Sequence, residues 1–259
     1  MKRIGCIIIV FIFLFVNLSI TVFANEVNTN FHSDITILRA GGGGSSGGGG
    51  GGSSGGGVGH TTHSGSGRTP TLFETILEFV MFPIVIFSST IVFYIKLTKW
   101  SRRSKKMMKQ MMQSDSAWKF KDVSEMVNDS FYAIQTAWSD MDMTPAAQYM
   151  SAELFDSFQI KLNWMSFKNQ KNILKNINLI KALPVAVYDD ADNSRDYIWF
   201  YIKGRMVDYI INTETQMRES GSTSAASFEE YWQFVRRDDR WVLNQILQKN
   251  ESGQIPFNE

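Results

Sequence analysis

The amino-acid sequence predicts an α+β domain in the C-terminal half of the chain, with N-terminal helices packed on one side of a four-stranded antiparallel sheet. Apolar residues recur at helical spacing before residue 172 and at strand spacing after it. Short acidic or Gly/Ser-containing segments separate the four strand-like runs, and none is long enough to hold a crossover helix. Sixteen of the 20 glycines fall between residues 41 and 67, so the first part of the chain has a different composition.

Residues 1–24 have the composition of a signal peptide or an uncleaved signal anchor. Lys2 and Arg3 precede a long apolar run, and Val22-Phe23-Ala24 forms a plausible but imperfect cleavage site. Both versions place the following segment outside the membrane. The only cysteine of the chain, Cys6, lies in this run, which excludes a disulfide within one chain and a cysteine-based metal site.

Residues 25–71 predict a disordered external segment, because a stretch of Gly and Ser has almost no side chains to bury. His60 and His63 suggest a weak metal site as an alternative. Two imidazoles on a disordered chain lack a third ligand, however, and we therefore predict neither a metal nor another cofactor.

Residues 72–97 predict a single transmembrane helix, because the run from Phe79 to Ile95 is apolar and long enough to span a bilayer. A basic juxtamembrane segment follows at residues 98–114. Positive charge beside a spanning helix is retained in the cytoplasm, which predicts a plasma-membrane protein with a cytoplasmic C-terminal domain. We expect the cations at and after the end of the predicted span to contact anionic lipid head groups. They are Lys96, Lys99, Arg102, Arg103, Lys105, Lys106 and Lys109.

We predict a folded domain at residues 115–250, followed by a tail at residues 251–259. Apolar residues from Val123 to Trp138 follow helical spacing. Thr144-Pro145 is a helix entry, and Ser151 caps a further helix that extends to Met165. Runs rich in β-branched and aromatic residues predict four strands. The predicted strands are 173–188, 197–211, 228–235 and 241–247, and the predicted turns are 189–193, 219–224 and 237–240.

Charge and residue types limit the function of this domain. Residues 122–259 carry 13 Lys/Arg against 20 Asp/Glu, which argues against a nucleic-acid partner. Residues 96–121 carry nine Lys/Arg against Asp115 alone, so the positive charge is local to the segment beside the predicted span. The domain has no His and no Cys, which removes the commonest general base, thiol nucleophile and transition-metal ligands. We therefore predict a non-catalytic domain.

An alternative is a small-molecule binder or enzyme that uses Asp208, which shares a strand face with apolar residues and could enter a pocket. Glu229 and Glu230 are most simply solvated. Trp199 and Tyr201 fall on the opposite face of the strand from Phe200, so one aromatic face could remain open to a partner. The candidate partner or pocket residues are Phe200, Asp208, Trp232, Phe234 and Trp241.

The segment from Phe228 to Arg237, which contains Trp-x-Phe-x-Arg, is followed by a charged turn and then by Trp241-Val242-Leu243-Asn244-Gln245-Ile246. This pattern resembles the C-terminal strand pair of the Tim-forty-four-like domain family. The stretches Phe131–Trp138, Met150–Leu154 and Asn172–Leu174 resemble the first long helix, the next helix start and the entry to the first strand of that family. The resemblance covers about residues 115–250.

The resemblance implies an α+β fold of nuclear-transport-factor-two or cystatin-like character with a concave apolar pocket. Bacterial members of the family commonly have a signal segment, a Gly-rich stretch and one span before this domain. The mitochondrial member contacts anionic lipid and helps recruit partners to a translocon. We therefore expect a membrane-anchored adaptor that binds a protein or lipid partner and is linked to protein transport or membrane-protein assembly. A role for the Gly-rich segment itself is the third alternative.

Overall fold

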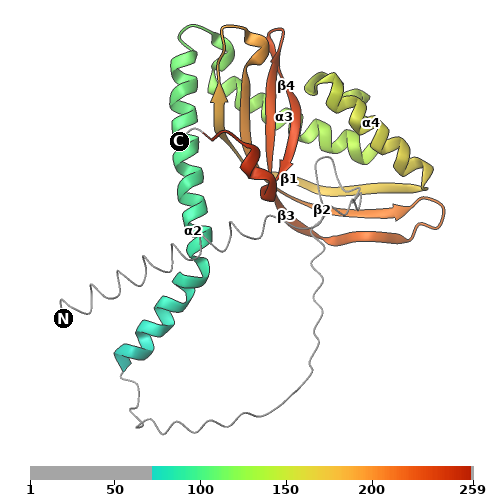
Figure 1. The fold of residues 1–259 in the computed structure, drawn as a ribbon. Helices are drawn as coiled ribbons and strands as arrows, with labels where there is room; N and C mark the ends of the chain where they lie inside the picture. Colours follow the sequence, from blue (N-terminus) through green and yellow to red (C-terminus); the bar gives the residue numbers. More distant parts are fainter. Residues whose placement is uncertain (1–71, 258–259) are drawn as a thin grey trace. The chain divides into compact units, whose positions relative to one another are not determined.

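The computed structural model describes residues 72–257, with side chains from Ser88 onward except Ser89. The predicted signal segment 1–24 and external segment 25–71 lie outside the described residues. Within residues 72–257, three α-helices and four strands follow one another (Figure 1). They are α2 (Leu72–Met111), α3 (Phe120–Asp140), α4 (Ala152–Phe167), β1 (Gln170–Tyr188), β2 (Tyr197–Asn212), β3 (Arg218–Arg237) and β4 (Arg240–Gln248). Short 3-10 helices are η1 (Ser116–Trp118), η2 (Thr144–Tyr149), η3 (Asn193–Arg195) and η4 (Lys249–Gln254).

The four strands form one antiparallel sheet in the order β1-β2-β3-β4, which confirms the predicted α+β class. The predicted turn at residues 219–224 is wrong, because these residues belong to β3 and pair with β2, as Asp208 does with Ser222. The turn lies at residues 213–217 instead. Gly221 has a φ of 79°, and a Cβ there would come within 2.6 Å of the Cα of Tyr209. This glycine therefore serves an irregular strand and not a loop.

The first core lies between the sheet and the helices α3 and α4. Helix α3 buries Val127, Phe131, Ile134 and Trp138, as the helical spacing predicts. Helix α4 begins as predicted, because the Ser151 hydroxyl accepts a hydrogen bond of 3.2 Å from the backbone N–H of Leu154. The sheet contributes a set of apolar side chains to this core. They include Ile198, Phe200, Ile202, Trp232, Phe234 and Leu243.

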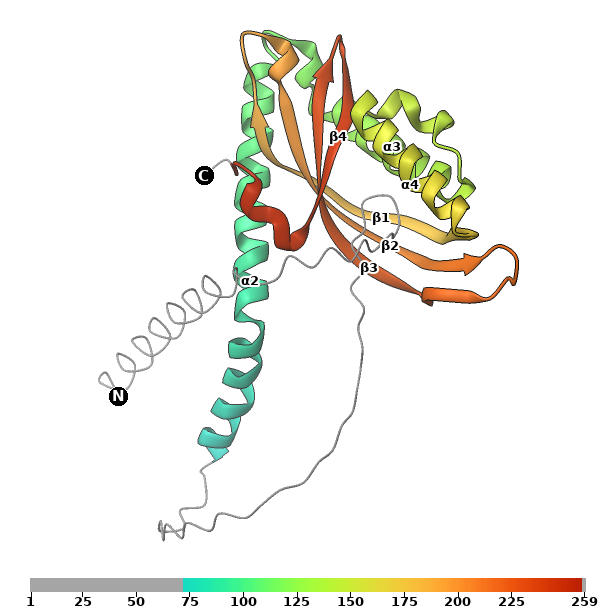
Figure 2. The same ribbon diagram turned by 45° about the vertical axis from the view of Figure 1, so that its right-hand side comes forward.

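A second core covers the opposite face of the sheet, where Trp199, Tyr201 and Tyr231 are buried. Helix α2 covers this face with Leu97, and the segment after β4 adds Ile255 (Figure 2). The helices predicted for one side of the sheet, α3 and α4, both lie there, whereas the docking of α2 on the other side was not predicted. The expected open aromatic face is also absent from the described part of the chain, since α2 and the C-terminal segment occupy it.

Helix α2 docks through a row of residues that lies within the basic cluster. Leu97, Ser101, Ser104 and Met108 follow one another at helical spacing and are all buried. The two serines are small enough for the helix backbone to approach the sheet closely. The helix also contains all of the residues 72–97 predicted to span a membrane. No helix within the described residues is both long enough and apolar enough to cross one.

Candidate functional site

The predicted lipid-contacting cations lie on the outer face of α2. Six of the seven are exposed, while Lys105 is half-buried, with its ammonium 4.3 Å from the centre of the Phe120 ring. No ion pair joins the exposed six to a carboxylate of the described residues. Ile91 and Ile95 are 49% and 63% exposed and lie two turns and one turn, respectively, before Lys99 on the same helix face. This face therefore changes from apolar to cationic along a single continuous helix.

Four of the predicted partner or pocket residues lie in the first core. Phe200, Trp232 and Phe234 are fully buried, and Trp241 is 7% exposed. The indole N–H of Trp232 donates to Glu230 Oε2 at 3.0 Å, and that of Trp241 donates to the carbonyl of Ala117 at 2.9 Å. In this conformation the four aromatic side chains fill the space between sheet and helices, so no partner can reach them.

Asp208 lies where β1, β2 and α3 meet. Its Oδ1 accepts a hydrogen bond of 2.8 Å from the side-chain amide of Asn172. Asn172 is fully buried, and its Oδ1 accepts from the indole N–H of Trp138 at 3.1 Å. The three side chains thus join the helix to two strands. This geometry favours a structural role for Asp208 over a role as a pocket base.

Glu229 and Glu230 are not solvated strand residues, contrary to the prediction. Glu230 is fully buried. Glu229 Oε1 lies 3.2 Å from the ammonium of Lys203 and accepts from the Tyr94 hydroxyl at 3.1 Å, while Lys249 binds its other oxygen. Burial raises the pKa of Glu229, but hydrogen bonds from Lys249 and Lys203 outweigh this and lower the pKa to about 2. This cluster joins α2, β2, β3 and η4.

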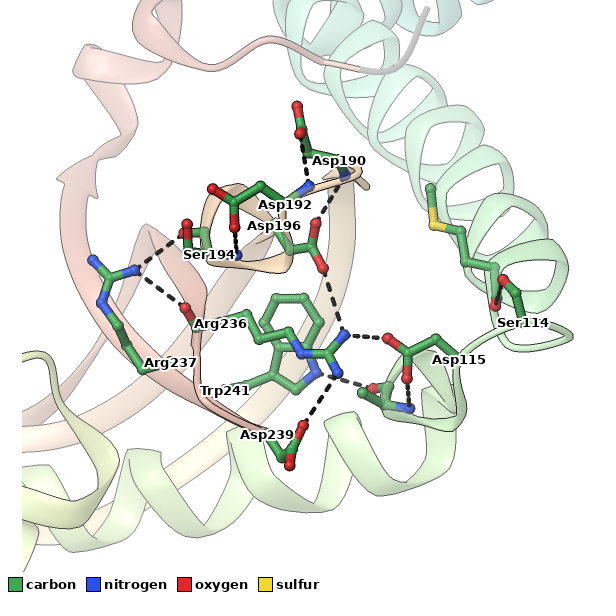
Figure 3. A network of polar contacts seen from close by, with 12 residues as sticks. Ser114, Asp115, Asp190, Asp192, Ser194, Asp196, Arg236, Arg237, Asp239 and Trp241 are labelled. Carbon is green, nitrogen blue, oxygen red and sulfur yellow. Dashed lines mark hydrogen bonds and ion pairs between the residues drawn. The ribbon is translucent and has the colours of Figure 1, made fainter.

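Arg236, the arginine of the Trp-x-Phe-x-Arg pattern, lies at the centre of a second polar cluster (Figure 3). Its guanidinium binds Asp115 and lies 3.5 Å from Asp196 and 3.6 Å from Asp239. The hydrogen bond from Arg236 lowers the pKa of Asp115, whereas burial raises the pKa of Asp196. The cluster ties η1, just after α2, to β3 and to the β1–β2 turn. It therefore fixes the position of α2 at this end of the sheet.

An exposed apolar row on α4 was not anticipated from the sequence. Ile160, Trp164 and Phe167 are 68%, 46% and 79% exposed, and we call these three residues the α4 stripe. The rings of Trp164 and Phe167 stack with centroids 5.8 Å apart, and the Lys168 ammonium lies 4.9 Å from the Trp164 ring centre. Their spacing of four and three residues is the signal that could have identified the row.

The described residues contain no group of three or more His, Cys, Asp or Glu side chains arranged to hold a metal ion. The Asp-rich β1–β2 turn is occupied by its own contacts. Asp190 binds the Arg195 guanidinium at 2.9 Å and accepts from the backbone N–H of Asp192 at 3.0 Å. Among the described residues, the outer face of α2 and the α4 stripe are both exposed to solvent.

Comparison with known proteins identifies one family. The family model of the Tim44-like domain matches residues 104–248, more than half of the chain. Among solved structures, the intermembrane space region of chloroplast protein ARC6 is similar, with 10% sequence identity and a TM-score of 0.38. That match covers 50% of this chain and 96% of the other. No curated protein sequence matches this chain.

Proposed function

Because this chain belongs to the Tim44-like domain family, we propose that it is a non-catalytic adaptor, related to protein transport, that α2 holds at a membrane. Family membership supports the adaptor role, and the match to residues 104–248 includes the last turns of α2. The sequence supports the membrane attachment, because the apolar run from Phe79 to Ile95 is long enough to span a bilayer.

The observation that carries this proposal is the continuity of α2. One helix of 40 residues contains the apolar run and then docks on the sheet through Leu97, Ser101 and Ser104. The Glu229 cluster holds Tyr94 of α2, and the Arg236 cluster holds Asp115 just after α2. These two polar clusters therefore fix the helix to the sheet at two points. A partner that binds the domain is therefore held at a fixed position relative to the apolar run, which suits an adaptor better than a flexible tether would.

The cations of α2 support a cytoplasmic location of the domain, because positive charge beside a span is retained on that side. They do not all lie at the same distance from the apolar run. A helix rises about 1.5 Å per residue, so Lys96, Lys99 and Arg102 lie within roughly 10 Å of Ile95, and Lys109 lies about 20 Å away. The screening length at physiological salt is about 8 Å. The first three residues should therefore contribute most of the attraction to anionic lipid.

Two measurements on the full chain in its own cell membranes test this proposal. The chain should remain in the membrane pellet after alkaline washing, and its C-terminal domain should be cleaved by protease only after the cells are opened. Lys96, Lys99 and Arg102 replaced together by Glu should reduce correct orientation, whereas the matched variant Lys106→Glu/Lys109→Glu should change it less. Release of the wild-type chain by alkaline washing would refute the membrane attachment.

A further inference from the structure

We propose that the α4 stripe is a contact between two copies of this chain, in which the two α4 helices pack side by side and antiparallel. The inference goes beyond the proposed adaptor function and does not depend on the membrane attachment. It concerns the face of α4 that carries Ile160, Trp164 and Phe167, together with the charged residues at the two ends of that face.

The first observation is that α4 is apolar on two opposite faces. Phe158, Leu162 and Met165 lie in the first core. The α4 stripe lies on the other side of the helix and is exposed to solvent. A helix with apolar side chains on both faces is normally covered on both. Exposed aromatic side chains that gather in this way are typical of a contact with another protein chain.

The second observation is the spacing of the residues on this face. Glu153 and Ser157 precede the α4 stripe, so that positions 153, 157, 160, 164 and 167 alternate in steps of four and three. This is the spacing along which two helices pack with the side chains of each set between those of the other. Ser157 is small, and an antiparallel neighbour places its bulky Trp164 or Phe167 beside that position. The first half of the face therefore has room for the second half of the same face in another copy.

The third observation is the distribution of charge along α4. Glu153 and Asp156 are exposed in its first two turns, and exposed Lys168 follows its last turn, with its ammonium 4.9 Å from the Trp164 ring centre. None of the three forms an ion pair with an oppositely charged side chain of the described residues. An antiparallel pair brings the acids of each helix beside Lys168 of the other, twice by two-fold symmetry. A parallel pair would bring like charges together, so the charges favour a second copy in the antiparallel orientation.

The position of α4 leaves this face accessible to a second copy. Helices α3 and α4 cover one face of the sheet, and α2 covers the other (Figure 2). A chain that packs on the outer face of α4 therefore leaves the contacts between α2 and the sheet untouched. One pair of helices buries less surface than a permanent subunit interface does, so we expect a dimer that dissociates on dilution.

Disulfide crosslinking of the full chain in its own cell membranes tests the contact and its orientation. In a Cys6→Ser background, Ile160→Cys lies near the two-fold axis and should form a crosslinked dimer under mild oxidation. Glu153→Cys and Lys168→Cys should each crosslink poorly alone, because a rise of about 1.5 Å per residue separates each from its own copy by roughly 20 Å. Expressed together, these two variants should form a mixed dimer. Lys121→Cys on α3 is the matched control, since the Lys121 side chain is 76% exposed on a different helix.

Sedimentation of the full chain in neutral detergent provides a second readout, the dissociation constant of the dimer. Phe167→Ser and Lys168→Glu should each weaken the dimer by about tenfold. Both side chains are exposed, so neither change should lower the melting temperature of the domain. The triple variant Glu153→Lys/Asp156→Lys/Lys168→Glu reverses both signs of charge and should recover most of the affinity that Lys168→Glu loses.

Several results would overturn the inference. Position 160 would crosslink no more than position 121, or positions 153 and 168 would each crosslink to their own copies as readily as position 160 does. Crosslinks from position 160 to a different protein only would assign the α4 stripe to that partner. A dimer of unchanged affinity in Phe167→Ser would place the contact elsewhere on the chain. None of these results bears on the membrane attachment, which is refuted separately by release of the chain on alkaline washing.

Discussion

Replacing Glu229 by Gln should destabilise the domain at neutral pH and have little effect at pH 2. The carboxylate lies between Lys203, Lys249 and the Tyr94 hydroxyl, and only 16% of its side chain is exposed. The amide of Gln is similar in size but carries no charge. The substitution therefore leaves two cations near each other without their common counter-ion.

The pKa of Glu229 gives the magnitude of this effect. The pKa is about 2 in the folded protein instead of the ordinary 4.5. At about 1.4 kcal/mol per pKa unit, this difference corresponds to roughly 3 kcal/mol of folding free energy. Because the folded state lowers the pKa, this stabilisation is fully present above pH 4.5 and is lost as the pH falls toward 2.

Thermal unfolding of the detergent-solubilised full chain, followed by tryptophan fluorescence between pH 2 and pH 7, measures this difference. A loss of about 3 kcal/mol lowers the melting temperature by roughly 6–12 °C at pH 7 for a domain of this size. Glu125→Gln is the control, since Glu125 belongs to an exposed pair with Lys121 that contributes less than about 1 kcal/mol. A deficit for Glu229→Gln that persists unchanged at pH 2 would refute the electrostatic explanation.

Three further predictions concern the packing of α2, the Arg236 ion pairs and the Trp138 hydrogen bond. Ser104→Leu places a larger side chain between α2 and the sheet and should cost about 1–3 kcal/mol in the same melting assay, and an unchanged melting temperature would contradict the close approach of α2. Arg236→Met leaves buried Asp196 without its cation and should cost about 3–5 kcal/mol. Adding Asp196→Asn should recover part of that loss, and strictly additive losses would argue against coupling. Trp138→Phe removes the buried hydrogen bond to Asn172 and should cost about 1–2 kcal/mol, so a neutral result would show that this bond adds no stability.

The sequence predicts the first core well because its signals are local. The helical spacing from Val123 to Trp138 and the Ser151 cap depend on neighbouring residues only, and both are found in the structure. The strand pattern likewise predicts four antiparallel strands. It fails at residues 219–224, because a Gly/Ser-rich strand and a turn have the same composition and only pairing with β2 distinguishes them.

The second core could not be predicted in the same way. Alternation along β2 shows that Trp199 and Phe200 point to opposite faces, but it does not show what covers each face. In α2, Leu97 and two serines lie among basic residues, and Met108 further along packs in the first core, so the apolar signal of the docking row is weak. The sequence pattern around Glu229 likewise predicts a solvated residue. Its partners Tyr94, Lys203 and Lys249 are distant in the sequence and meet only after α2 has docked.

The second core also constrains the order in which the molecule assembles. The residues that close it come from positions 93–100 and 255–257, on either side of the whole sheet in the sequence. Contacts between such distant segments form late, because the intervening chain must first be ordered. A folding intermediate with a complete sheet but an undocked α2 exposes the aromatic side chains of Trp199, Tyr201 and Tyr231. That surface is shielded only when the sheet meets α2, so the docking of α2 completes the folding of the domain.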